Sequence, residues 1–262
     1  MKIASWNVNS LKVRLPQVLD WLAQSKPDVL ALQETKLTDE NFPQDDINAA
    51  GYQVMFSGQK TYNGVAIIAK AQPEDPVTDI PDLDDPQRRI LAATVDGVRV
   101  INLYVVNGQE VGSEKFAYKM RWLAAVKQFV SEQMAVYPQL VVLGDFNIAP
   151  DDRDVHDPDA WRGKILCSPE ERDKLNAFVQ LGLTDSFRHF ESEAGHFSWW
   201  DYRAAGFRRN LGLRIDLLLA SEALMQCANA AGIDKTPRSW ERPSDHTPIW
   251  ATFDPAKTKT GP

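Results

Sequence analysis

Polar side chains that could do chemistry follow several apolar runs of this sequence, at the points where those runs end. Asn7 and Glu34 follow the first two runs, and Asp145 and Asn147 follow Leu140–Leu143. A carboxylate at the end of a buried strand is held rigidly near low dielectric, which favours a metal or proton-transfer role. A single residue of this kind is more often a turn or cap residue, but several in one chain make that explanation unattractive. The remaining sets are Asp216 and Ser244-Asp245-His246.

These residue types favour hydrolysis of a phosphodiester by an activated water molecule. Glu34, Asp145, Asn147 and Asp245 carry hard oxygen ligands, the kind that Mg²⁺ prefers. His246 follows Asp245 directly, and an imidazolium beside a metal ion would stabilise charge on the phosphorane-like oxygens. An aspartate would orient the attacking water.

Asp216 interrupts the apolar run Leu213–Leu219, and two interpretations fit it. It could form a carboxylate–imidazole pair with His246, which would fix the tautomer of the ring and raise its pKa. It could equally be a buried strand residue whose carboxylate is satisfied by backbone groups.

Other hydrolytic chemistries lack their residue patterns. His246 has no second histidine in an HxH or HxxxH arrangement, so a zinc site is poorly supported. The sequence has no GxSxG motif and no glycine-rich P-loop, and neither cysteine adjoins a candidate base. The other histidines are interpreted as surface or loop residues: His156, His189 and His196.

The composition is that of an ordinary globular chain. Its 262 residues are 44% hydrophobic and 25% charged, which suits one large α/β domain or two small ones. No apolar run approaches the roughly 20 residues that a membrane helix needs, and no signal-peptide pattern precedes the first strand-like residues. Cys167 and Cys227 form no CxxC pair and suit a reducing cytosol, so disulfides and zinc–thiolate sites are not expected.

The net charge of −7 leaves the partner open. The carboxylates of a metal site contribute to it, and DNA responds to the local field rather than to the total charge. Solvated surface charge is the commoner explanation for basic clusters, yet several exist here. They are Arg88-Arg89, Arg203 with Arg208-Arg209, Arg214, and Arg238 with Arg242.

The periodicity predicts an alternation of buried strands and amphipathic helices. The expected strands are Lys2–Val8, Asp28–Gln33, Gly64–Ala69, Ile90–Val95, Val98–Val105, Leu140–Leu143, Leu213–Leu219 and Pro248–Phe253. The expected helices are Arg14–Gln24, Ser113–Val136 with Ser113 as N-cap, and one that begins with the Ser168 capping box and runs to Gly182. Because some strands follow one another directly, two packed sheets flanked by helices fit better than one doubly wound sheet.

The motifs, taken in order, resemble those of the exonuclease III family within the endonuclease–exonuclease–phosphatase (DNase I-like) superfamily. The resemblance runs from Lys2 to about Asp254 and implies a four-layer α/β sandwich, with residues 1–256 as one domain and 257–262 as a disordered tail. Its most specific motifs are Leu32–Lys36 (LQETK), Gly144–Pro150 (GDFNIAP), Leu213–Leu219 (LRIDLLL) and Ser244–His246 (SDH).

The resemblance implies a role for each matching site residue. Glu34 resembles the principal Mg²⁺ ligand, with Asn7 near the metal and phosphate, and Mn²⁺ could substitute for Mg²⁺. Asp145 resembles the residue that activates or orients the water, and Asn147 the one that holds the scissile phosphate. The family pattern further assigns phosphate contact and help to the leaving group to Tyr104. Asp245 and His246 resemble the terminal pair, in which Asp245 belongs to the metal site and His246, oriented by Asp216, is bonded to a phosphate oxygen.

The resemblance also implies a DNA-binding face. Lys36, Arg88, Arg209 and Arg214 are expected to contact the DNA backbone. Phe197–Tyr202, with Leu213 and Ile215, resembles a pocket for an extruded abasic sugar, in which Trp199 is the expected contact and Trp200 is expected in the core. Where family members often carry a small residue before the capping box, this chain has Leu166. We expect its side chain to crowd that pocket and to reduce abasic incision relative to 3′-end trimming.

The implied activity is that of a bacterial repair nuclease whose partner is double-stranded DNA, especially at abasic sites and blocked 3′ ends. The protein is expected to be a monomer in the cytoplasm, associated with the nucleoid, and to have no membrane partner. It would combine 3′→5′ exonuclease, 3′-phosphatase or 3′-phosphodiesterase, and abasic-site endonuclease activities in base excision repair. The alternatives are a specialised 3′-end processor with weak abasic incision, a superfamily relative acting on phospholipids, phosphoinositides or RNA, and a non-enzymatic nucleic-acid-binding relative.

Overall fold

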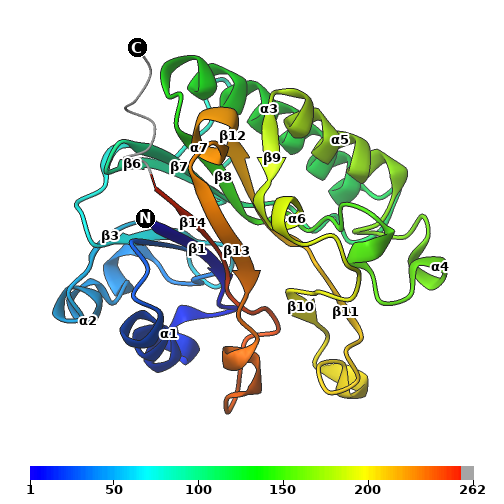
Figure 1. The fold of residues 1–262 in the computed structure, drawn as a ribbon, viewed down its shortest axis with the longest axis horizontal. Coiled ribbons are helices and arrows are strands. Elements are labelled where there is room, and N and C mark those ends of the chain that lie inside the picture. The colour runs from blue at the N-terminus through cyan, green and yellow to red at the C-terminus, as the bar shows by residue number, and fades with distance from the viewer. Residues whose placement is uncertain (255–262) are drawn as a thin grey trace.

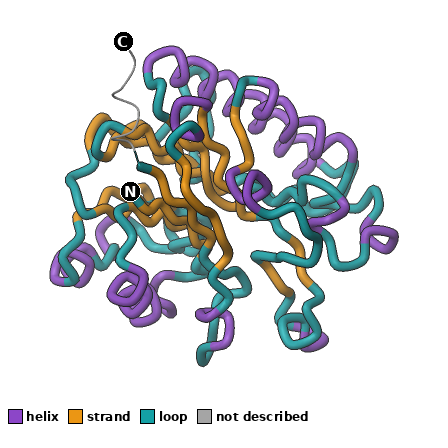
Figure 2. Tube along the Cα trace, viewed as in Figure 1, coloured by secondary structure: helices purple, strands orange, loops and turns teal. Residues whose placement is uncertain are grey.

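The computed structural model describes residues 1–254, which form two six-stranded mixed sheets packed face to face (Figure 1; Figure 2). The first sheet has the order β13-β14-β1-β2-β4-β3. Its strands are β1 (Lys2–Asn7), β2 (Val29–Gln33), β3 (Gln53–Ser57), β4 (Val65–Ala69), β13 (Ala228–Ile233) and β14 (Ile249–Phe253). β1 and β2 are parallel, so their carboxyl ends lie at the same edge of the sheet.

The second sheet has the order β5-β6-β7-β8-β12-β9. Its strands are β5 (Glu74–Val77), β6 (Ile90–Val95), β7 (Val98–Tyr104), β8 (Leu140–Asp145), β9 (Leu183–Asp185) and β12 (Asp216–Ser221). A separate short pair, β10 (Trp199–Trp200) and β11 (Gly212–Leu213), projects beside the ends of the two sheets (Figure 1).

Helices cover the outer face of each sheet, which completes four layers (Figure 1). The first sheet carries α1 (Leu11–Ser25) and α2 (Gln44–Ala49), and the second carries α3 (Glu114–Val136) and α5 (Pro169–Gln180). The shorter helices are α4 (Pro158–Trp161), α6 (Ser186–Phe190) and α7 (Glu222–Met225). The four-layer prediction is confirmed.

The core consists of three main apolar layers, because the strands alternate their side chains between two buried faces. Ile3 and Val141 belong to the layer between the sheets. Trp6 packs beneath α1, and Trp122 and Phe178 belong to the layer beneath α3 and α5. This double burial explains why the strands read as continuous apolar runs.

Most predicted elements are present with shifted ends. The Ser113 hydroxyl caps α3 by accepting from the Phe116 backbone N–H at 3.1 Å, and the capping box at Ser168 is formed. The first helix begins at Leu11 instead of Arg14, and α5 ends at Gln180. No helix in residues 1–254 is long and apolar enough to cross a membrane. The predicted tail at 257–262 lies outside the described residues.

The single strand predicted over Leu213–Leu219 is wrong. The structure divides it into β11 and β12, with Arg214 and Ile215 between them. The Arg214 N–H donates to Asp154 O at 2.9 Å, and the Ile215 N–H donates to the Ser198 hydroxyl at 3.1 Å. These two donors therefore leave the sheet ladder, and the chain turns out of the sheet at the edge of the site.

Candidate active site

Strand register brings the predicted residues together. Tyr104 of β7 lies opposite Asp145 of β8, and Asp145 lies opposite Asp216 of β12. In the other sheet, Asn7 ends β1, and Glu34 directly follows β2 with a left-handed φ of 51°. The strand ends of both sheets therefore supply one cluster of polar side chains.

Asn7 joins the two sheets across this cluster. Its Nδ2 donates to Glu34 Oε1 at 2.8 Å and to Asp145 Oδ2 at 2.9 Å, while its Oδ1 accepts from the Asn9 N–H at 3.0 Å. Asn7 is fully buried. In this geometry its amide fixes the two carboxylates, and its own oxygen is already engaged.

Glu34, Asp145 and His246 each offer one possible metal-ligand atom, and these three atoms lie within 4.8 Å of one another. Within residues 1–254 this is the one group of three or more histidine, cysteine or carboxylate side chains that lie so close together. Carboxylate oxygens held this closely by a neutral amide repel each other, and a divalent cation would relieve that repulsion. The donor set therefore fits a hard metal ion, with Glu34 and Asp145 as the residues that would hold it.

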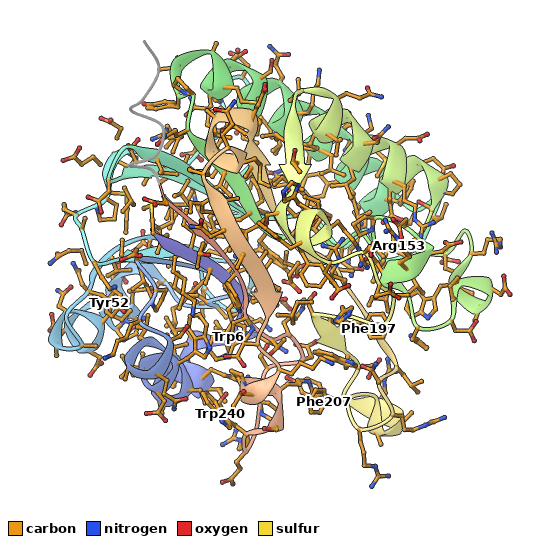
Figure 3. The ribbon with its side chains drawn as sticks, in the orientation of Figure 1. Trp6, Tyr52, Arg153, Phe197, Phe207 and Trp240 are labelled. Atoms are coloured by element: carbon orange, nitrogen blue, oxygen red, sulfur yellow. The ribbon has the colours of Figure 1, made fainter. Side chains whose placement is uncertain are left out.

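His246 is oriented by Asp216, as one of the two sequence interpretations proposed. Its Nδ1 lies 2.8 Å from Asp216 Oδ2, and its Nε2 lies 3.6 Å from Asp145 Oδ2. Ser198 donates its hydroxyl to the same Asp216 oxygen at 2.7 Å. Trp6, labelled in Figure 3, donates its indole N–H to the His246 carbonyl at 3.3 Å. Asp216 thus orients the imidazole, and Trp6 anchors the backbone of His246.

Burial and mutual proximity shift the pKa values of this group. Burial is the main reason that the pKa of Asp145 is raised to about 7, with Asp216 and Glu34 adding to the effect and His246 opposing it. Burial alone would lower the pKa of His246, but Asp216 and Asp145 outweigh it and raise that pKa to about 10. The neighbouring carboxylates therefore favour the protonated form of the ring.

Asn147 is held by three hydrogen bonds in a left-handed conformation with φ of 49°. Its N–H donates to Asp145 Oδ1 at 2.9 Å, and its Nδ2 donates to Val105 O at 2.9 Å. Its Oδ1 accepts from Asn107 Nδ2 at 3.3 Å. Asparagine tolerates this backbone better than most residues, which suits its place two residues after the end of β8.

Tyr104 lies beside the two carboxylates. Burial, followed by the charges of Glu34 and Asp145, raises the pKa of its phenol well above the ordinary value. The Arg89 guanidinium lies 4.8 Å from the centroid of its ring. Tyr104 therefore keeps its proton and can donate a hydrogen bond.

Asp245 is not part of the close ligand group. Its Oδ1 accepts from Asn9 Nδ2 at 3.1 Å, and its Oδ2 accepts from the Trp199 indole N–H at 3.0 Å. The structure thus places this predicted metal ligand between the strand end of β1 and the wall of the predicted sugar pocket.

Of the predicted DNA-contacting residues, Lys36 lies at the site and Arg209 is exposed, whereas Arg88, Trp199 and Leu213 are engaged with other residues or buried. Lys36 lies at the site, where its Nζ donates to Asn9 Oδ1 at 2.7 Å and lies 3.3 Å from Glu34 Oε2. Arg209 is exposed in the segment between β10 and β11. Arg88 is paired with Asp79 at 2.8 Å, and half-buried Trp199 contacts Asp245. Leu213 is fully buried.

The prediction that Arg214 contacts DNA is wrong. Its side chain is 1% exposed, and its guanidinium is paired with Asp154 at 2.6 Å and Asp185 at 2.7 Å. Both carboxylates are remote in sequence from Arg214. The arginine therefore fixes the chain between β11 and β12 from inside.

Two organising residues escaped the sequence interpretation. Ser198, inside the aromatic segment, binds Asp216 through its hydroxyl, and Asn107 supports the amide of Asn147. Neither stands at the end of a predicted strand. The adjacency of Ser198 to Trp199 was the only available signal, since Asn107 lies in an ordinary loop.

The fold and this site define a phosphodiesterase nuclease. Residues 4–246 match the Endonuclease/Exonuclease/phosphatase family, and the chain belongs to the exonuclease III/AP endonuclease branch of that superfamily, whose members are metal-dependent. Exodeoxyribonuclease III of Haemophilus influenzae is 38% identical over 97% of this chain and 100% of the relative.

Solved structures of the same branch are closely similar. The 3′-5′ exonuclease NExo from Neisseria meningitidis superposes with a TM-score of 0.96 at 51% identity, over 97% of this chain and 100% of that one. A Neisseria NExo structure described as a 3′ phosphatase is bound to a product DNA hairpin. An AP endonuclease from Archaeoglobus fulgidus gives a TM-score of 0.94 at 37% identity, over 97% and 99% of the two chains.

Proposed function

We propose that this protein is a Mg²⁺-dependent repair nuclease that processes 3′ ends of double-stranded DNA and incises abasic sites only weakly. It removes nucleotides in the 3′→5′ direction and clears 3′-phosphates and other 3′ blocks during base excision repair. Mn²⁺ can replace Mg²⁺, and the protein acts as a monomer in the cytoplasm of a bacterial cell. The observation that carries the 3′-end preference is the position of Leu166.

Leu166 packs against the residues that resemble the family's pocket for an extruded sugar. It is 5% exposed and belongs to one apolar cluster with Leu213 and Ile215, against which half-buried Trp199 packs. Its φ of 71° is in the left-handed region, where a branched side chain is strained and glycine is not. A small residue would fit this backbone better and would leave the cluster partly open.

The relatives support the same preference. NExo, at 51% identity, is described as a 3′-5′ exonuclease and as a 3′ phosphatase. The AP endonuclease from Archaeoglobus fulgidus, at 37% identity, shows that the same scaffold also carries abasic-site activity. The residue in the pocket is therefore a reasonable determinant of the balance between the two.

The remaining site residues supply the chemistry of phosphodiester hydrolysis. A metal ion held at Glu34 and Asp145 would neutralise phosphate charge. Asp145 orients the attacking water and accepts its proton, and Asn147 holds the phosphate. The His246 imidazolium donates to a phosphate oxygen, and the protonated Tyr104 phenol stabilises the leaving oxygen.

A comparison of two substrates tests the proposal. One duplex carries an internal abasic analogue and the other a recessed 3′-phosphate, and kcat/KM is measured for each with Mg²⁺ or EDTA. We expect Mg²⁺-dependent release of phosphate, weak abasic incision, and at least a tenfold rise in the abasic to 3′-phosphate ratio for Leu166→Gly. Asp145→Asn should be inactive on both substrates.

Asp96→Gly is the matched control, since Asp96 also has a left-handed φ, of 47°, in the turn between β6 and β7. It should leave the ratio unchanged. An unchanged ratio in Leu166→Gly, or wild-type incision as fast as phosphate release, would refute the 3′-end preference. Inactivity on both substrates with retained DNA affinity would support the binding-protein alternative instead.

A further inference from the structure

Lys119 of α3 carries a charge that is completely removed from solvent. Its side chain is 0% exposed, and its ammonium donates to the Asn147 carbonyl at 2.7 Å and to the Asn107 carbonyl at 3.1 Å. Its third partner is the Glu171 carboxylate. An ammonium has three N–H donors, so all of them are used.

Glu171, in the first turn of α5, is equally buried and equally satisfied. Its Oε1 accepts from Lys119 and from the Leu166 N–H at 3.0 Å. Its Oε2 accepts from the Ser168 N–H at 3.1 Å and from the Ser168 hydroxyl at 2.7 Å. One carboxylate thus serves as the capping-box acid, the partner of Lys119, and the anchor of the Leu166 backbone.

The pair connects three loops that reach the active site. Asn107 lies after β7, Asn147 lies after β8, and Leu166 precedes α5. Asn107 and Asn147 also meet through their side chains at 3.3 Å. The loop that carries Asn147 and the loop that carries Leu166 are therefore tied to one buried ion pair.

Fold stability alone is a weak reason for this arrangement. Removing two charges from water is costly, and apolar residues of similar volume often stabilise a core as well or better. A buried, fully satisfied polar group does, however, specify one position for the groups that it binds. Here those groups are backbone atoms of Asn107, Asn147 and Leu166, together with the Ser168 cap.

We propose that Lys119 and Glu171 are positioning residues for catalysis and substrate choice, which fix Asn147 relative to the Leu166 loop. The role in catalysis rests on the fact that this chain belongs to the nuclease branch. The role in substrate choice rests on the proposed 3′-end preference. The pair contacts the peptide groups of Asn147 and Leu166 and acts on substrate only through them.

The test uses the double variant Lys119→Met/Glu171→Gln in the full chain. Glutamine retains hydrogen bonding to the Ser168 cap, and both buried charges are removed together, so the variant should fold. Loss of the two carbonyl bonds of Lys119 should lower its melting temperature. We expect kcat on a recessed 3′ end to fall about 10- to 100-fold, as for a misplaced catalytic group, with KM within about threefold. We also expect the abasic to 3′-phosphate ratio to change.

Arg99→Met controls for a merely structural effect. Arg99 is also a buried cation beside α3, but it binds Gln133 near the other end of that helix. It should lower the melting temperature without changing kcat or the ratio. Glu171→Gln alone is the second variant, to be used if the double variant does not fold. We expect it to lose kcat to the same extent as the double variant.

The outcomes separate this inference from the proposed function. Wild-type kcat and ratio in the folded variants would overturn the positioning role, as would the same kcat loss in Arg99→Met. A loss of kcat with an unchanged ratio would retain the catalytic half and reject the effect on substrate choice. The Leu166→Gly result decides the 3′-end preference independently, since that variant leaves the ion pair intact.

Discussion

His246 Nδ1 and Asp216 Oδ2 are 2.8 Å apart, on segments that are separated by 30 residues. Ser198 donates to the same Asp216 oxygen, and both groups are buried. This bond leaves His246 Nε2 directed toward Asp145, at 3.6 Å. Asp216 thus determines that Nε2 is the ring nitrogen that faces Asp145.

Asp216→Asn should therefore lower kcat by about 10²- to 10⁴-fold, the range for loss of a positioned acid–base group. The amide removes the negative charge that holds the pKa of His246 high, so the ring should become neutral at lower pH. Steady-state kinetics on a 3′-phosphate duplex and NMR titration of the ring test this. Ser198→Ala should produce a smaller loss in the same direction, and a wild-type kcat in Asp216→Asn would refute the role.

Removal of the metal ion should abolish activity, and Glu34→Gln should weaken metal binding. Glu34 supplies one of the two close carboxylates, so its loss reduces the charge of the donor set. We expect the Mg²⁺ concentration for half-maximal activity to rise about 10- to 100-fold, the range of metal-affinity losses on substitution around a metal site. Exposed Glu40→Gln is the control, and identical Mg²⁺ curves would exclude Glu34 as a ligand.

Much of the site could be predicted because its residues interrupt apolar runs. Asp145 and Asp216 stand out chemically within or after buried strands, so their roles could be proposed without coordinates. Their alignment, however, depends on the register of β8 and β12, which no local pattern encodes. Ser198 was missed for the same reason, since its partner lies 18 residues away.

Arg214 shows a second limit of sequence interpretation. Arginine is usually exposed, so the sequence favoured a surface role. Its burial depends on Asp154 and Asp185, which are 60 and 29 residues away. The long helix α3 was easier, because its N-cap and its periodic apolar face are local signals.

Trp199→Phe should reduce activity by removing one hydrogen bond while keeping an aromatic ring. The indole N–H donates to Asp245 Oδ2 at 3.0 Å. A hydrogen bond to a charged group contributes about 1.5–3 kcal/mol, so we expect kcat/KM to fall roughly 10- to 100-fold. Trp250→Phe, whose ring lies beside Lys2 and Gly232, is the matched control. Full activity of Trp199→Phe would show that Asp245 does not depend on this bond.

Acid should weaken the fold through Asp28, which joins β1 to the end of β4. Burial tends to raise the pKa of Asp28, but the Lys2 N–H and Lys70 outweigh it, so this pKa is lowered. The unfolded chain then binds the proton more readily, and the stabilisation is present above the unfolded pKa and is lost as the pH falls through the folded pKa. At pH 7, Asp28→Asn should lower the free energy of unfolding by about 1 kcal/mol and reduce the melting temperature accordingly. At pH 3 the loss of unfolding free energy should be smaller. An equal deficit at both pH values would contradict the assignment.

Arg209 and Arg214 should respond to substitution in opposite ways, because one is exposed and the other is buried between two carboxylates. Arg209→Ala should weaken duplex binding for all sequences and reduce the slope of log affinity against log salt by about 1, with no change in melting temperature. Arg214→Met should leave Asp154 and Asp185 without their shared partner, at a cost of about 3–5 kcal/mol of unfolding free energy. Fluorescence anisotropy across a salt series and thermal unfolding of both variants measure the two effects. A reduced salt slope in a fully stable Arg214→Met would return that arginine to the DNA-binding face.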